Sequence, residues 1–132
     1  MTIEERQALL SIHVDRVKER ACAWGVDDCT RWAADWVEAV RGIDLMLPTY
    51  RGEAEGRALI AKAGGLEKLW SDALACAGMY RVHKPSYGDV GLIETRLGLI
   101  GAIAAHDGLC AVRTVSGVTF LRPRDFRALW AI

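Results

Sequence analysis

The stretch DDCTRWAADWVEAVRG, residues 27–42, decides the fold of this chain. Its apolar residues recur at i, i+3, i+4, i+7, i+8 and i+11, which places them on one helical face. These residues are Cys29, Trp32, Ala33, Trp36, Val37 and Val40. With Asp28 as N-cap and Gly42 after the last turn, the pattern predicts a helix over Cys29–Arg41. Its two indoles make this helix the expected centre of the core.

Three further helices are expected in the first part of the chain. Thr2 and Glu5 form a capping-box pattern that opens a helix over residues 3–21. A third helix is expected over residues 53–63, ended by Gly64-Gly65. A fourth, over residues 66–77, has its apolar residues at helical spacing and is closed by Gly78.

Beyond residue 88 the pattern changes to short β-like runs separated by turns. The expected strands are residues 89–94, 97–105, 109–115 and 118–122, with a last strand near 128–131. Asp107-Gly108 between two apolar runs indicates a tight hairpin, and Ser116-Gly117 marks another turn. The sequence therefore predicts one α+β domain over residues 1–132. Its N-terminal helices (about 1–78) pack on a small C-terminal antiparallel sheet (about 88–132).

Composition narrows the class of protein. Hydrophobic residues make up 52% and charged residues 26%, which is typical of a folded domain. Lys plus Arg number 17 and Asp plus Glu number 17, so the net charge is zero. Zero net charge argues against binding to nucleic acid and favours self-association. The sequence has no apolar run long enough for membrane insertion and a charged N-terminus, so a cytoplasmic chain without a signal peptide is expected.

The four cysteines, at positions 22, 29, 76 and 110, show no Cys-x-x-Cys spacing. No metal site and no cofactor are therefore expected. Cys29 is the candidate nucleophile, because the first turn of a helix favours a thiolate. Asp27 and Asp28 directly before it oppose that charge. The alternative reading is that Cys29 is a small apolar residue on the core face of the helix.

Two motifs carry a resemblance to a known family. Asp28-Cys29 opens a Trp-rich helix, and Gly88-Asp89-Val90 precedes the first strand. This order resembles the NlpC-type cell-wall cysteine peptidases, which are papain-like. The resemblance implies that Cys29 corresponds to the nucleophile and that a histidine should begin the second strand.

The chain is still more similar to a family of short phage and prophage proteins with this outline. The shared pieces span residues 21–101 and are Trp24-Gly25, Asp28-Cys29, Ala33-Ala34-Asp35, Gly42-x-Asp44, Arg51-Gly52, Gly64-Gly65-Leu66 and Gly88-Asp89-Val90-Gly91. One departure is that Glu53-Ala54 stand where an aromatic residue is expected after Arg-Gly.

The larger departure concerns the base. Leu99 or Ile100 stands where the peptidases have their catalytic histidine, and an aliphatic side chain cannot accept a proton. His106, at the far end of the same strand, is the candidate for a displaced base. His13 is expected within the first helix and His83 in a solvated loop.

Other conspicuous residues are expected to be structural. The tryptophans at 24, 32, 36, 70 and 130 fit core packing better than a sugar-binding groove. The arginines at 122, 124 and 127 fit a solvated or partner-facing edge. Gly98 and Gly101 indicate bends or close backbone contact within a strand.

The function expected from the resemblance is that of a phage or prophage protein, tail-associated, which keeps the peptidase fold without catalysis and works as a structural or adaptor module. Its partners would be other virion proteins or further copies of itself, and its location the virion after assembly. The alternative is an active hydrolase of peptidoglycan stem peptides. In that case Cys29 is the nucleophile and His106 or His83 the base.

Overall fold

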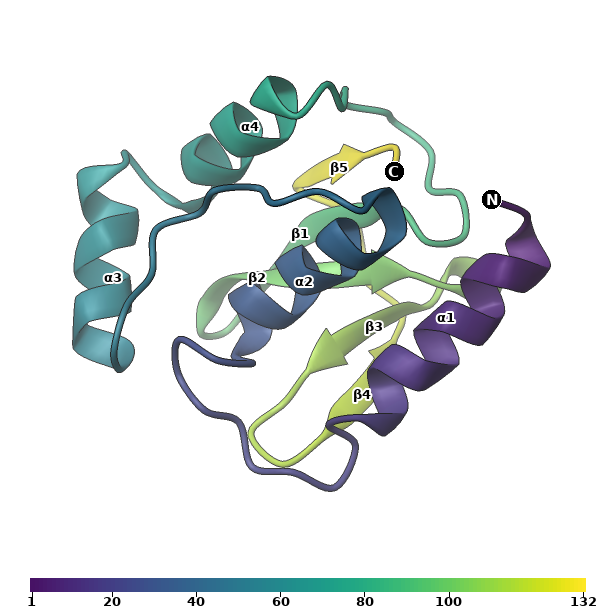
Figure 1. Ribbon diagram of the computed structural model, residues 1–132, viewed down its shortest axis with the longest axis horizontal. Helices are drawn as coiled ribbons and strands as arrows, with labels where there is room; N and C mark the ends of the chain where they lie inside the picture. The colour runs from purple at the N-terminus through teal and green to yellow at the C-terminus, as the bar shows by residue number, and fades with distance from the viewer.

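The computed structural model describes all 132 residues and has an α+β architecture, with helices first and sheet second (Figure 1). The helices are α1 (Ile3–Asp15), α2 (Cys29–Arg41), α3 (Glu53–Lys62) and α4 (Leu66–Cys76). The strands are β1 (Val90–Thr95), β2 (Gly98–Ala104), β3 (Cys110–Arg113), β4 (Val118–Leu121) and β5 (Ala128–Trp130). The predicted fold class is confirmed.

The sheet is antiparallel throughout, in the order β4-β3-β2-β1-β5. Since β4 and β5 occupy opposite edges, residues 122–127 must cross the sheet between them. They cross the face away from the helices, where Phe126 packs on a small cluster that includes Ile93 and Ala102. A Cβ on Gly91 would lie 2.5 Å from the Phe126 ring, so this crossing requires glycine there.

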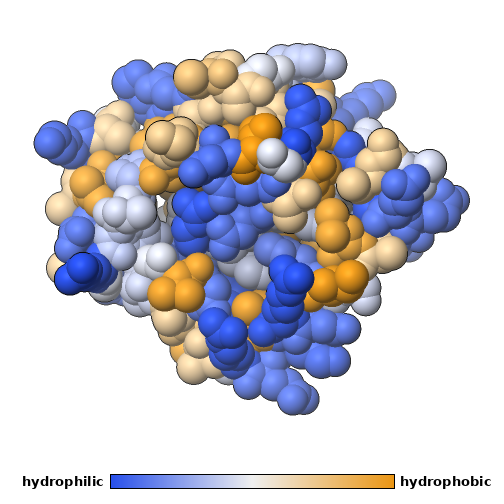
Figure 2. Space-filling model, in the orientation of Figure 1, coloured by the Kyte–Doolittle hydropathy of each residue, from blue (hydrophilic) through white to orange (hydrophobic).

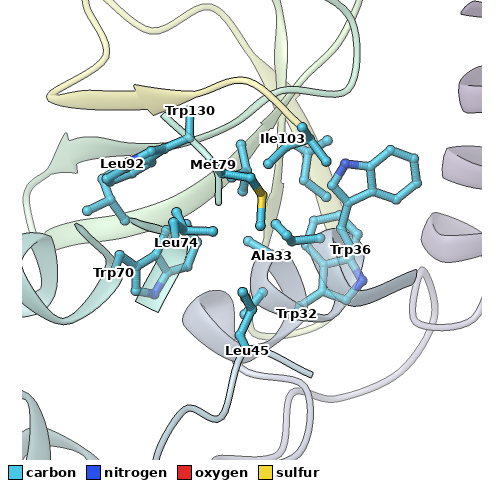
Figure 3. Packing of buried hydrophobic residues seen from close by; sticks show 14 of the residues in the cluster. Trp32, Ala33, Trp36, Leu45, Trp70, Leu74, Met79, Leu92, Ile103 and Trp130 are labelled. Carbon is cyan, nitrogen blue, oxygen red and sulfur yellow. The ribbon is translucent and has the colours of Figure 1, made fainter. Parts of the chain in front are cut away.

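On the other face of the sheet α2 lies against β2 and β3, α1 packs against α2, and α3 lies to one side against α4 (Figure 1). The main core forms between the helices and the sheet and draws residues from helices and strands alike (Figure 3). Trp32 and Trp36 from α2 are fully buried, and the Trp36 Nε1 donates to the Gly88 carbonyl at 2.8 Å. The predicted central position of α2 is confirmed.

One helix prediction is wrong at its end. α1 stops at Asp15, whereas the sequence pattern predicts a helix to residue 21. The following main chain bonds to the β3–β4 hairpin instead. Arg113 donates to the Arg20 carbonyl at 2.9 Å, and the Cys22 N–H donates to the Val115 carbonyl at 2.7 Å. These long-range hydrogen bonds replace the helical bonds that the local pattern predicts.

The other predicted boundaries agree with the structure to within two residues. The predicted tight hairpin between β2 and β3 is also confirmed. Asp107 and Gly108 both have positive φ, and the Leu109 N–H donates to the His106 carbonyl at 2.9 Å. This is the type I′ geometry that an Asp-Gly pair favours.

On the helical side of the molecule, hydrophilic and hydrophobic residues are interspersed (Figure 2). None of the helices has the length and apolar character needed to cross a membrane.

Candidate active site around Cys29

Asp28 fixes the start of α2 and so positions Cys29. Its Oδ1 accepts from the main-chain N–H groups of Thr30 and Arg31 at 3.0 and 2.9 Å. Its Oδ2 accepts from the Gly25 N–H at 2.7 Å and from the Tyr50 hydroxyl at 2.6 Å. The side chain is fully buried. This confirms the predicted N-cap and shows that the carboxylate also joins the preceding loop and residue 50 to the helix.

A buried arginine, which the sequence analysis does not single out, holds the loop before α2. The Arg113 side chain has no solvent exposure and lies with Nη2 3.4 Å from Asp27 Oδ2. It donates to the carbonyls of Asp27 at 3.1 Å, Arg20 at 2.9 Å and Gly117 at 2.8 Å. The only local signal for this role is a charged residue inside the apolar run of β3.

Gly101 allows the first turn of α2 to approach β2 closely. A Cβ at this position would lie 2.7 Å from the Ala33 Cβ and 2.9 Å from the Cys29 carbonyl oxygen. The prediction of close backbone contact at Gly101 is confirmed. Gly98 has a φ of +103° at the start of β2, which fits the predicted bend.

The Cys29 side chain is partly buried, in the first turn of α2. Burial raises the pKa of its thiol above the usual value, and the negative charge of Asp28 raises it further. Hydrogen bonds with Thr30 favour the thiolate but do not reverse the shift. The sequence analysis sets the helix N-terminus, which favours a thiolate, against the preceding aspartates, which oppose it. Because the net shift of the Cys29 pKa is upward, the thiol is protonated at neutral pH.

Leu99 is one of the two β2 residues that the sequence analysis aligns with a catalytic histidine. It lies on the α2 side of β2, where it packs against the main core, two residues before Gly101. Ile100 points to the opposite face of the sheet, where it packs against the smaller cluster. Of the two residues that the sequence analysis left open, only Leu99 faces the helix that carries Cys29.

The structure does not bring a histidine to Cys29. His106 follows Gly101 by five residues, or about 16 Å along an extended strand. At that end its Nε2 lies 2.7 Å from the Gln7 Nε2, and its ring stands 4.7 Å from that of Tyr87. His83 is exposed in the loop between α4 and β1.

His13 is part of the core. Its Nε2 lies 2.9 Å from the Trp32 carbonyl and must donate, because a carbonyl only accepts. The imidazole stacks on the Trp32 ring at 4.7 Å between centroids. Burial lowers its pKa, so His13 is neutral at physiological pH.

The remaining predicted residues have structural surroundings. Four tryptophans, at 32, 36, 70 and 130, belong to the core as predicted, whereas Trp24 is partly exposed beneath the Arg57 guanidinium, 5.8 Å away. The arginines at 122, 124 and 127 are exposed. Arg127 pairs with Glu67 at 3.0 Å, and Arg122 donates to the Asp107 carbonyl at 2.6 Å.

The fold and the site together define an α+β domain with a partly buried cysteine in the first turn of its central helix and the aliphatic Leu99 on the α2 side of β2. The chain belongs to a family described as a domain of unknown function (DUF6950), whose model matches residues 1–132. Comparison with curated proteins and with solved structures gave no match.

Proposed function

We propose that this chain is a non-catalytic protein with an NlpC-type, cysteine-peptidase-like fold, which acts as a structural or adaptor module. The observation that supports the proposal is Leu99, an aliphatic side chain on the strand face where the thiol would need a base. A cysteine nucleophile needs a proton acceptor within about 3 Å, directly or through one water.

The polar groups near Cys29 do not supply that base. Asp28 accepts four hydrogen bonds, which engage both of its oxygens. Tyr50 donates to Asp28, and burial together with that bond raises the pKa of its phenol far above the usual value. It therefore keeps its proton at neutral pH. These two residues build the loop and are unsuited to activating the thiol.

The setting of the proposal, a tail-associated phage or prophage protein, comes from the sequence resemblance alone. The proposed partners are other virion proteins or further copies of this chain. Mass spectrometry of purified particles tests this setting. The chain is expected among the particle proteins, and its consistent absence from particles of a phage that encodes it contradicts the assembly role.

The inert thiol is tested by the pH dependence of alkylation at each cysteine, resolved by peptide mass spectrometry. Cys76 is exposed and serves as the internal control for an ordinary thiol. Cys29 is expected to react more slowly than Cys76 at neutral pH and to match it only after unfolding. Fast alkylation of Cys29 in the folded protein at neutral pH contradicts the proposal.

The alternative, a peptidoglycan hydrolase with Cys29 as nucleophile, gives the opposite result in a wall-lysis assay. Under the proposal, the parent protein and a Cys29→Ala variant both leave purified cell walls intact. Lysis by the parent that the variant loses establishes the hydrolase and refutes the non-catalytic role.

A further inference from the structure

The sheet has one covered edge and one open edge. Beyond β5, residues 80–82 run alongside the strand. The Val82 N–H donates to the Leu129 carbonyl at 2.9 Å, and the Ala131 N–H donates to the Tyr80 carbonyl at 3.2 Å. Beyond β4, no segment of the chain pairs with the strand.

The register shows which main-chain groups of β4 face outward. The Thr114 N–H donates to the Gly117 carbonyl at 2.9 Å, so residues 114 and 117 form a hydrogen-bonded pair. Such pairs alternate along an antiparallel ladder. Thr119 therefore bonds to β3, while the N–H and C=O groups of Val118 and Phe120 point away from the sheet.

β4 has only four residues, and the loop after α1 bonds to the adjacent hairpin at Val115, but the edge lacks the other features that protect an edge strand. Eight consecutive residues, 114–121, carry no charge and no proline. The β3–β4 register is constant, so there is no bulge. Phe120 is 47% exposed and Val115 is 82% exposed. Edge strands of this kind are prone to pair with another strand.

We propose that β4 pairs with β4 of a second copy of this chain, which makes a two-fold symmetric dimer with a continuous sheet. In antiparallel register about Thr119, Val118 meets the Phe120 of the other copy, and Phe120 meets its Val118. Each of these two equivalent pairs exchanges two main-chain hydrogen bonds. The four outward-facing groups on each copy are thus satisfied by the same groups on the other.

The side chains fit this register. Val118 and Phe120 share one face of β4, so each side of the dimer gains an aromatic–β-branched cross-strand pair. Thr119 meets its own copy on the other face, and Thr–Thr pairs are also favourable. Arg122 falls opposite the uncharged Ser116, so no like charges meet across the strands. The zero net charge of the chain adds no repulsion between copies.

This inference deepens the proposed assembly role and rests on it for its biological purpose. Its test measures association alone, whereas the proposed function is tested by thiol reactivity and wall lysis. Failure of one is therefore distinguishable from failure of the other.

The first test measures mass in solution by light scattering over a concentration series. The wild-type chain is expected to reach twice the chain mass. A Thr119→Lys variant places like charges directly opposite each other at the axis and should weaken dimerisation by about fivefold or more. Thr119 is exposed, so the monomer fold is expected to survive, as circular dichroism would verify.

The second test is a cross-link, made in a Cys76→Ser background to remove the exposed native thiol. Residues facing each other in a non-hydrogen-bonded pair have Cα atoms about 4.5 Å apart, within disulfide range. A Thr119→Cys variant should therefore form covalent dimers under mild oxidation. A Val115→Cys variant, also at an exposed position but off the axis, is the matched control and should form far fewer.

A wild-type chain that stays monomeric at every concentration overturns the proposal. So does a dimer that Thr119→Lys leaves unchanged, or equal cross-linking at positions 115 and 119. If the edge instead serves an extended segment of an unrelated protein, the isolated chain is monomeric, and self-pairing is refuted.

Discussion

Two buried aspartates, Asp28 before α2 and Asp89 before β1, differ in how firmly their carboxylates are held. At the first turn, Asp28 accepts four hydrogen bonds of 2.6–3.0 Å. Directly before β1, Asp89 accepts from the N–H of Ser86 at 2.8 Å and of Ile132 at 3.4 Å, with Arg6 at 4.0 Å.

The pKa of Asp89 shows the looser arrangement. Burial raises it above the ordinary value, and its hydrogen bonds and Arg6 offset that shift only in part. The stronger hydrogen-bond network is thus that of Asp28, directly before Cys29. In this chain the network holds a loop and a helix start, and it leaves the thiol protonated. The comparison teaches that the Asp28-Cys29 pair can be explained by the structural contacts of Asp28 alone.

The largest expected effect on stability is at Arg113, which holds the loop before α2. Replacing it in an Arg113→Met variant removes the buried cation of Asp27, which then pairs only with the exposed Arg20, and deprives the carbonyls of Arg20 and Gly117 of a donor. Breaking a buried ion pair of this kind costs about 3–5 kcal/mol. Urea unfolding followed by tryptophan fluorescence measures the loss.

The matched control for Arg113 is Arg57→Met. The Arg57 side chain is 62% exposed, pairs with Glu53 across one helical turn and lies over the partly exposed Trp24 ring. Its loss should change the free energy of unfolding by less than about 0.5 kcal/mol. Equal unfolding midpoints for the two variants would show that the Arg113 network does not secure the loop.

The next prediction compares the two aspartates directly. Asp28→Ala removes an N-cap and the Tyr50 bond and should cost about 3 kcal/mol in unfolding free energy. Asp89→Ala removes fewer and longer bonds and should cost about 1 kcal/mol. Thermal and urea unfolding of both variants measure the difference. A larger loss of unfolding free energy in Asp89→Ala than in Asp28→Ala would contradict the expected order of the two aspartates.

A third prediction tests whether an imidazole at position 99 activates the Cys29 thiol. Leu99→His places an imidazole on the α2 side of β2, where a protonated ring would favour a thiolate on Cys29. A fall of about one unit in the Cys29 pKa, which is about tenfold faster alkylation at neutral pH, is expected. Ile100→His, on the opposite face, is the control and should leave the rate unchanged. Unchanged alkylation in Leu99→His would mean that more than the base is missing.

What the sequence predicted depends on how far apart the interacting residues lie along the chain. The bounds and caps of α2, and the Asp107-Gly108 turn, follow from neighbours within a few positions, and all were predicted. The end of α1 was not, because Arg113, far along the chain, binds the Arg20 carbonyl. No local pattern contains that contact.

The same contrast between local and long-range contacts applies to the candidate site. The place of Cys29 in a first helical turn follows from local spacing, but its protonation state depends on burial, which only the tertiary structure supplies. Likewise, the choice between Leu99 and Ile100 needed the strand register, since adjacent residues face opposite sides of a sheet. Arg113 carries only the weak signal of a charge within an apolar strand.

The smallest expected effect is a pH dependence of the unfolding free energy. It arises at His13, which stacks on Trp32 in the first turn of α2. Burial holds the pKa of His13 below its unfolded value of about 6.5, so the unfolded chain binds the extra proton first. Stability from this residue is therefore full above about pH 6.5 and declines as the pH falls through the folded pKa. Asp89, whose pKa is raised, contributes to the pH dependence of stability with the opposite sign.

The effect of His13 is therefore measured as the difference in the slope of unfolding free energy against pH between wild type and a His13→Gln variant, by urea unfolding at several pH values. That variant should flatten the decline below pH 6.5, whereas His83→Gln, at an exposed position, should not. Equal slopes in all three proteins would mean that His13 takes up a proton without leaving the core.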